Sequence, residues 1–240
     1  MKVASYNIHK CRGTDGQMSP ERIIAVIKEL DADLVALQEV DQRFGRRLGL
    51  LNLDRLQEET GLNLLVQSDR PNGHGWHGNA LLVRGTPKHY HRTRLTLPGI
   101  EPRGAVMAEL DLGQGMFRVI GAHLGLLRRS RVEQMNTLLA TFRGLQSMPT
   151  ILLGDFNEWR RGSRSSLDVL APVFGATHSP PSFPSRRPLL PLDRALGWPA
   201  GTISNVAVHE SPLSRVASDH LPLMAYADIR PALDTMDRAA

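Results

Sequence analysis

Several apolar stretches of this chain run directly into polar side chains that can bind a metal ion or a phosphate group. In chain order these side chains are Asn7, Glu39, His123, Asp155 with Asn157, and Asp219 with His220. Carboxylate and amide oxygens are hard ligands, which suit Mg²⁺ or Mn²⁺ better than zinc. A single Asp or Asn after a strand is usually a turn former. Five such endings without a sequence repeat instead favour one shared site.

Strands must hold these side chains, and the hydrophobic pattern predicts where the strands lie. The run from Lys2 to Ile8 alternates like a strand, and 34–37 and 150–154 have the pattern of buried strands. Further strands are expected at 62–66, 79–84, 105–112, 117–123, 194–196, 204–208 and 221–227. Strand ends that gather on one edge of a sheet bring together groups that are far apart in sequence.

Three helices are predicted between these strands. The first has Ser19 as its N-cap, with Pro20 at its first position, and the second spans 53–60 and stops at Gly61. The third begins at Ser130, where Ser130-x-x-Glu133 has the form of a capping box. Prolines between 178 and 192 predict an irregular loop. Strands interleaved with helices, some in direct succession, indicate an α/β protein with mixed sheets.

Six short segments carry a family resemblance because they occur together and in a set order. They are Tyr6-Asn7-Ile8-His9, Leu37-Gln38-Glu39-Val40, Gly78-Asn79-Ala80-Leu81, Ala122-His123-Leu124, Gly154-Asp155-Phe156-Asn157 and Ser218-Asp219-His220-Leu221-Pro222. The set closely resembles the endonuclease/exonuclease/phosphatase superfamily, which has the deoxyribonuclease I-like fold. The resemblance implies a four-layer sandwich of two mixed β-sheets packed face to face, with helices on the outside. It implies one domain over 1–230, followed by a short tail at 231–240.

The resemblance also implies hydrolysis of phosphate esters with a divalent metal, Mg²⁺ or Mn²⁺, and a role for each matching residue. Glu39 matches the main metal carboxylate, Asn7 lies beside it, and Asp219 adds a further carboxylate. Asp155 and Asn157 match the pair that positions the attacking water and the phosphate. His220 matches the catalytic histidine, and either His220 or Asp155 takes the proton from water.

Other positions are expected to orient the catalytic histidine or to contact the substrate. Asp193 resembles the carboxylate that orients His220 through its ring N–H. His123 matches a position that stabilises the leaving group. Asn79, Arg103 and His9 are the candidate substrate contacts, although strand entry, a turn or a solvated loop would explain each of them equally well.

The charge of the chain permits an anionic substrate. The net charge is +5, and only four of the 29 basic residues are lysine. Arginine suits phosphate because its planar fork makes two hydrogen bonds at once, although a GC-rich genome would also favour arginine. Clusters beside the motifs would strengthen nucleic-acid binding if they line the cleft: Arg128, Arg129 and Arg131; Arg160, Arg161 and Arg164; Arg186 and Arg187. Few aromatic residues argue against extensive base stacking.

The substrate class stays open at this stage. Nucleic acid is the first sub-case of a phosphodiesterase or phosphatase, while a phospholipid headgroup at a membrane surface or a small phosphoester is the alternative. A catalytically silent module that binds a phosphate ligand is the non-enzyme alternative, and no protein partner is implied. A rate assay separates the enzyme hypotheses from the silent module, and measurements of binding to DNA and to liposomes separate the nucleic-acid and lipid hypotheses.

The sequence lacks the motifs of several other classes of protein. Gly73-His74-Gly75-Trp76-His77-Gly78 satisfies G-x-G-x-x-G, but it precedes a predicted strand, whereas a dinucleotide site needs a helix there. Neither G-x-S-x-G nor H-E-x-x-H occurs. The single cysteine, Cys11, excludes an internal disulfide. No signal-peptide core follows Met1, so a cytoplasmic location is the expectation.

Overall fold

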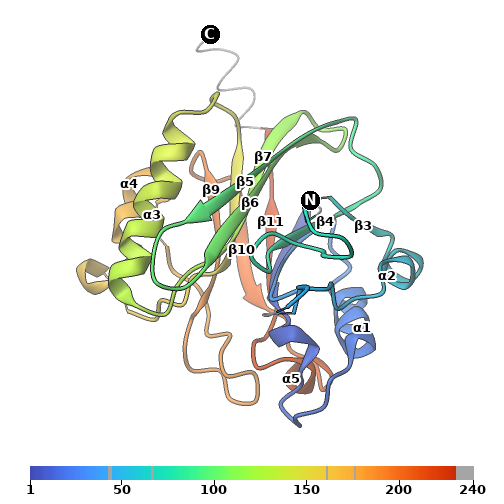
Figure 1. Ribbon diagram of the computed structural model, residues 1–240. Coiled ribbons are helices and arrows are strands. Elements are labelled where there is room, and N and C mark those ends of the chain that lie inside the picture. The colour runs from blue at the N-terminus through green and yellow to red at the C-terminus, as the bar shows by residue number, and fades with distance from the viewer. Residues whose placement is uncertain (43–44, 66–67, 161, 176, 231–240) are drawn as a thin grey trace.

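The computed structural model describes residues 1–42, 45–65, 68–160, 162–175 and 177–230. The predicted tail at 231–240 and the end of the strand predicted at 62–66 lie outside these ranges. Within them, the chain forms two mixed β-sheets with helices on both sides (Figure 1).

The first sheet has six strands in the order β10-β11-β1-β2-β4-β3. β1 (Lys2–Asn7) pairs in parallel with β2 (Leu34–Gln38) and antiparallel with β11 (Leu223–Ala227). The remaining strands, all antiparallel to their neighbours, are β3 (Leu62–Leu64), β4 (Ala80–Arg84) and β10 (Ile203–Val208).

The second sheet has five strands in the order β5-β6-β7-β8-β9. Its centre is the parallel pair β7 (Met116–His123) and β8 (Thr150–Asp155). Antiparallel strands flank that pair: β5 (His89–Leu97), β6 (Arg103–Asp111) and β9 (Asp193–Trp198).

Three long helices cover the outer faces of the sheets. α1 (Pro20–Leu30) and α2 (Leu53–Thr60) lie against the first sheet, and α3 (Arg128–Arg143) lies against the second (Figure 1). Shorter helical segments are η1 (His9–Cys11), η2 (Gly162–Arg164), η3 (Asp168–Leu170), α4 (Ala171–Phe174) and α5 (Ser214–Ala217). In the described ranges, no helix is long and apolar enough to span a membrane.

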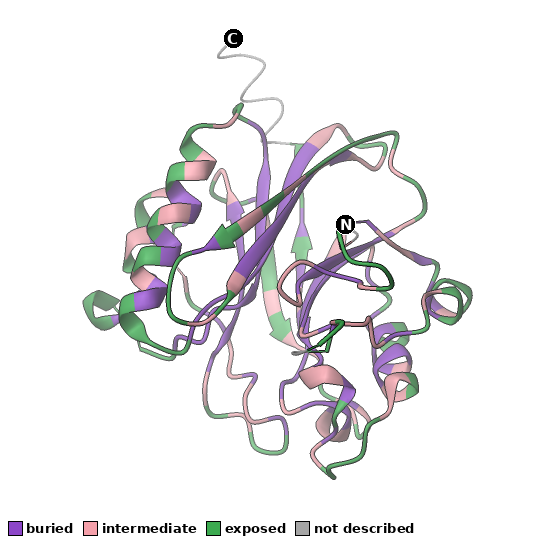
Figure 2. Cartoon of the chain, viewed as in Figure 1, coloured by how far each residue is buried: buried purple, intermediate pink, exposed green. Residues whose placement is uncertain are grey.

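Alternation of side chains explains the layers. Val3, Leu34, Val119 and Ile151 point into a core between the two sheets, and their neighbours in sequence point outward. The outward residues of the first sheet form a second core with α1 and α2, and those of the second sheet form a third with α3 and α4. Buried residues accordingly concentrate in the sheets and on the inner helix faces (Figure 2). The predicted four-layer α/β sandwich is confirmed.

The first two helix predictions are confirmed, and the start predicted for the third is wrong. Ser19 Oγ accepts a hydrogen bond from the backbone N–H of Arg22, and α2 stops at Gly61 in a left-handed conformation. α3, however, begins two residues before Ser130, and its N-cap, Leu127, makes no side-chain bond. Glu133 pairs instead with Arg129, one turn earlier on the exposed face, at 3.1 Å.

Strand β5 was not predicted. Its sequence from His89 to Thr96 is polar except for Tyr90 and Leu95, and this edge strand of the sheet is largely exposed (Figure 2). A polar edge strand lacks the alternation of apolar residues on which the prediction depends.

Candidate active site

The ends of the strands bring the predicted site residues to one edge of the sandwich. Asn7 ends β1, Glu39 follows β2, and His123 and Asp155 end the parallel strands β7 and β8. The antiparallel strands β6 and β9 start at the same edge, with Arg103 and Asp193; Asn79 directly precedes β4, and Asp219 with His220 lies shortly before β11.

The register of strands β7, β8 and β9 places three of these side chains in one row. His123 is the cross-strand partner of Asp155, and Asp155 is the partner of Asp193. All three continue the alternating face that forms the core between the sheets. Gly154 allows this close packing, because a Cβ on it would lie 1.9 Å from the carbonyl oxygen of Ala122. The pleat therefore aims these polar groups toward the first sheet, where Asn7 lies.

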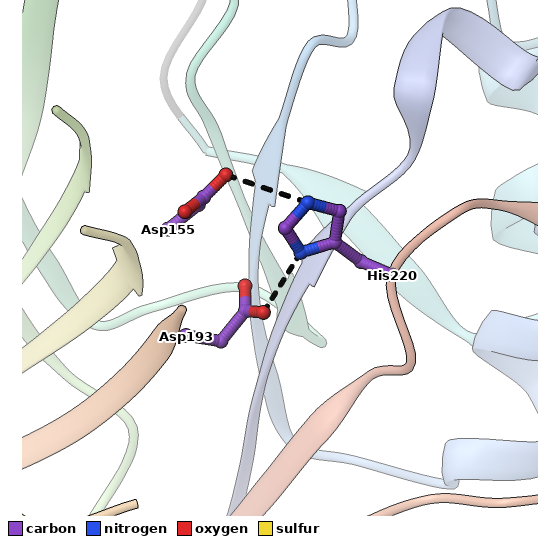
Figure 3. Close-up of side chains that lie close together, drawn as sticks. All are labelled: Asp155, Asp193 and His220. Atoms are coloured by element: carbon purple, nitrogen blue, oxygen red, sulfur yellow. Dashed lines mark hydrogen bonds and ion pairs between the residues drawn. The ribbon is translucent and has the colours of Figure 1, made fainter. Parts of the chain in front are cut away.

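His220 lies between two buried carboxylates (Figure 3). Its Nδ1 is 2.9 Å from Oδ2 of Asp193, and its Nε2 is 3.7 Å from Oδ2 of Asp155. Burial alone would lower the pKa of His220, but Asp193, Asp155 and Asp219 together raise it to about 10. The neighbouring carboxylates therefore favour the protonated form of the ring.

Asp155 is the centre of the hydrogen-bond network. Its Oδ2 accepts a bond from Nδ2 of Asn7 at 2.9 Å, and its Oδ1 accepts one from the backbone N–H of Asn157 at the same distance. Nε2 of His123 is 3.4 Å from Oδ2. The amide of Asn157 donates to the carbonyl oxygen of Leu124, which ties the loops after β7 and β8 together.

His123 is buried and neutral. Burial lowers its pKa to about 3, although the Asp155 carboxylate acts in the opposite direction. Nη1 of Arg103 lies 2.9 Å from Nε2 of His123, and Nη2 of Arg103 pairs with Glu101 at 2.9 Å. Arg103 thus contacts one end of the row formed by His123, Asp155 and Asp193, which we call the catalytic row, without being part of it.

Glu39 and Asp219 lie apart from this network. Glu39 follows β2 in a left-handed conformation, with φ of 61°, and its carboxylate accepts a hydrogen bond from Nζ of Lys10. Asp219 lies 3.7 Å from Nδ1 of His9, whose backbone N–H donates to Oδ1 of Asn7. Carboxylate oxygens are hard donors that suit a divalent metal. The Glu39 carboxylate already holds the cationic ammonium group of Lys10, so it could hold such a metal.

Asp155, Asp193 and His220 also have the composition of a metal site, with one donor atom from each within 4.8 Å of the others. The two carboxylates, however, face different nitrogens of the ring (Figure 3). His220 thus links the two carboxylates, with a hydrogen bond from Nδ1 to Asp193 and an ion-pair contact from Nε2 to Asp155. Glu39, outside this group, is a further carboxylate that could hold a metal.

Asn79 supports the wall of the site. Its buried amide donates to the carbonyl oxygens of Trp76 and Gly104, at 3.1 and 3.0 Å. These bonds hold the glycine-rich segment 73–78 against β6, where a Cβ on Gly104 would lie 2.9 Å from the ring of His77. Nδ2 of Asn79 is thus engaged with the backbone, whereas its buried Oδ1 has no hydrogen-bond partner among the described residues.

The proline-rich loop supplies residues that the sequence did not single out. Ser182 Oγ donates to Asp193, and the ring of Phe183 lies 4.9 Å from the ring of His220. Lys10 is likewise a site residue, since its ammonium group donates to the Glu39 carboxylate. Serine and phenylalanine in an irregular loop carry no sequence signal for these contacts, because only the folded path of the loop creates them.

A cavity of about 400 Å³ opens beside the network. Glu39, Lys10, His123 and Arg103 line one part of it, and Arg47, Arg70, Trp76 and His77 line another. None of the described arginines in the three predicted clusters lines this cavity. Arg131 is instead fully buried, where it pairs with Glu158 at 3.3 Å.

Comparison with known proteins agrees with this architecture. The family model described as "Endonuclease/Exonuclease/phosphatase family" matches residues 4–220. The uncharacterised protein YbhP of Escherichia coli K12 is 30% identical over 93% of this chain and 94% of its own length.

Solved structures share the fold at lower identity. An endonuclease/exonuclease/phosphatase from Beutenbergia cavernae superposes with a TM-score of 0.68 at 23% identity, covering 94% of this chain and 70% of that one. D. rerio TDP2 complexed with a single-strand DNA product gives 0.66 at 14% identity, over 94% and 97%. The chain therefore belongs to the endonuclease/exonuclease/phosphatase family, whose members are metal-dependent phosphoester hydrolases.

Proposed function

We propose that this protein hydrolyses a phosphodiester by in-line attack of water, with Mg²⁺ or Mn²⁺ held by Glu39 together with Asn7 and Asp219. The observation that carries the proposal is the position of His220 between Asp193 and Asp155, next to a cavity that Glu39 lines. When bound, the cation would neutralise charge on the phosphoryl and leaving oxygens.

In this proposal His220 and Asp155 have different roles. A protonated His220 has no lone pair with which to accept the proton of the attacking water. The Asp155 carboxylate accepts that proton as the oxygen–phosphorus bond forms and the ester bond opposite it breaks. Nε2–H of His220 faces the same space and stabilises the negative charge that develops on the phosphoryl oxygens.

Asp193 and Ser182 act as positioning residues for His220. The Asp193 carboxylate accepts from Nδ1 of the ring and from Ser182 Oγ, which fixes the ring plane. Asn157, held by Asp155 and by the carbonyl oxygen of Leu124, is placed to orient the phosphate. Arg103 and Lys10 supply further positive charge along the cavity wall.

The cavity also bears on the substrate. Its volume accommodates a phosphate with its flanking groups, and two further arginines, Arg47 and Arg70, line it. A phosphodiester within a nucleic-acid strand is one substrate of this kind, as in the single-strand DNA product bound to D. rerio TDP2.

A rate assay tests the proposal. Bis(p-nitrophenyl) phosphate is incubated with protein and Mg²⁺, Mn²⁺ or EDTA, and the Glu39→Gln and His220→Gln variants are compared with the wild type. His209→Gln is the matched control, because His209 pairs with Glu29 through Nε2 at 2.8 Å outside the site. Turnover that requires metal and is lost in the first two variants supports the proposal. Full activity in EDTA, or in both site variants, would refute it.

A further inference from the structure

Large apolar side chains are exposed together beside the active site. Ile100, Leu126, Leu127 and Trp159 are 85%, 61%, 52% and 45% exposed. They come from three loops: the β5–β6 turn, the β7–α3 loop and the segment after β8. Exposed large hydrophobic residues that gather at one place mark an interaction surface, whereas scattered ones are ordinary.

Specific contacts hold these loops side by side. The carboxylate of Glu101, next to Ile100, accepts the backbone N–H of Leu126 at 2.9 Å. The buried guanidinium of Arg131 donates to the carbonyl oxygen of Leu126 and lies 5.8 Å from the ring of Trp159. These contacts bring together the loops that carry the four exposed apolar residues, and we call Ile100, Leu126, Leu127 and Trp159 the apolar rim.

The apolar rim borders the cavity. Glu101, Pro102 and Arg103 directly follow Ile100 and line the cavity, and Trp159 is two residues beyond Asn157. A partner that binds the apolar rim would consequently lie next to the cavity that His123 and Arg103 line.

Basic side chains surround the apolar rim. Arg128, Arg160 and Arg164 are exposed and have no acidic partner among the described residues, and the guanidinium of Arg160 lies 5.5 Å from the ring of Trp159. The nearby acids are already engaged: Glu133 pairs with Arg129, and Glu101 pairs with Arg103. The border of the rim is therefore positively charged.

We propose that the apolar rim docks on an anionic phospholipid bilayer. Apolar loop tips that enter the boundary between headgroups and acyl chains, with arginines beside them at the level of the headgroups, are the arrangement that binds such a surface. Binding there places the cavity mouth against lipid headgroups. The proposal concerns a binding surface, so it does not depend on the proposed catalytic function.

The test is co-sedimentation of the full chain with phosphatidylcholine vesicles, with and without phosphatidylserine. We expect binding that requires phosphatidylserine and weakens as salt rises. The triple variant Ile100→Ser, Leu126→Ser, Leu127→Ser should lower the partition coefficient roughly tenfold or more, since each side chain loses part of its apolar burial. The Arg128→Gln, Arg160→Gln variant should remove the preference for phosphatidylserine.

Matched controls come from the same class of residue elsewhere on the surface. Met18 and Leu189 are 59% and 62% exposed, and the Met18→Ser, Leu189→Ser variant should bind vesicles like the wild type. Trp159 provides a local readout, because brominated lipid should quench its emission and Trp159→Phe should abolish the quenched component.

Three outcomes would overturn the proposal. One is the absence of binding to either vesicle. Another is equal binding by the triple variant and the Met18, Leu189 control. The third is self-association of the wild type in light scattering that the triple variant abolishes without any vesicle binding, which would identify the rim as a contact between copies.

Discussion

Nη1 of Arg103 lies 2.9 Å from Nε2 of His123. A guanidinium can only donate hydrogen bonds, so Nε2 of His123 must carry a lone pair and its proton must be on Nδ1. The 3.4 Å approach of the same nitrogen to Asp155 is therefore a contact with a neutral ring. His123 holds Arg103 in place at the end of the catalytic row.

His123 should accordingly stay neutral throughout the range in which histidines usually titrate. Burial lowers its pKa to about 3, so its protonated form is absent at neutral pH. Long-range ¹H–¹⁵N spectra from about pH 5 to pH 8 should show a protonated Nδ1, an unprotonated Nε2 and no change in either shift. Movement of the His123 shifts over this range would contradict the assignment.

Asp193 and His220 should behave as one functional unit. Asp193→Asn and His220→Gln each remove the oriented imidazolium, so each should lower kcat by roughly 10²–10⁴-fold. The double variant should lose little more than either single one, because both changes abolish the same interaction. Steady-state kinetics on a chromogenic phosphodiester measures this. Losses that multiply in the double variant would show that the residues act separately.

Lys10 should compete with a divalent cation for Glu39. Its ammonium group donates to the Glu39 carboxylate, so a second positive charge at that carboxylate is disfavoured. Lys10→Met should therefore tighten Mg²⁺ binding several-fold, and Glu39→Gln should abolish it. Isothermal titration calorimetry with Mg²⁺ measures both variants. Lys28→Met, on α1, is the control for a general change in charge; unchanged affinity in both Lys10→Met and Glu39→Gln would place the metal elsewhere.

The Arg131–Glu158 pair should be essential for stability. Both side chains are buried, and Glu158 also accepts bonds from the backbone and hydroxyl of Ser166. Arg131→Met leaves a buried carboxylate uncompensated, which should cost about 3–5 kcal/mol in the free energy of unfolding. Arg129→Met, in an exposed pair on the same helix, should cost less than about 1 kcal/mol. Urea denaturation compares them, and equal costs would contradict this account.

Cys11 should make stability fall at alkaline pH. Burial raises the pKa of its thiol to about 12, above the ordinary value, so the folded chain keeps its proton where the unfolded chain has lost it. The unfolded state then binds fewer protons, and the free energy of unfolding decreases as pH rises beyond about 8.5.

The decrease at Cys11 amounts to about 1.4 kcal/mol between about pH 7 and pH 9.5. Urea denaturation at both pH values should show a correspondingly smaller decrease for Cys11→Ala than for the wild type. The thiol should also resist alkylation until the chain unfolds. Rapid modification of the folded protein at neutral pH would exclude a buried, protonated thiol.

The sequence by itself indicated the strands and the polar residues at their ends, and the resemblance of its motifs to a known family implied the four layers. Alternation of apolar residues marked nearly every strand, and polar residues where the apolar runs stop marked Asn7, Asp155 and His123. Both signals are local, since a strand buries alternate residues wherever it lies. The order of the motifs identified the family because their chemistry depends on residue type and chain order.

Only the tertiary structure decided which groups meet and which charges they carry. The register of β7, β8 and β9 places His123, Asp155 and Asp193 in one row, and the path of the proline-rich loop sets Ser182 and Phe183 around His220. The same holds for Arg131, which is buried although its neighbours Arg128 and Arg129 are exposed. Burial and pairing are properties of contacts between distant segments, and they set the pKa of a group, so residue type alone does not specify them.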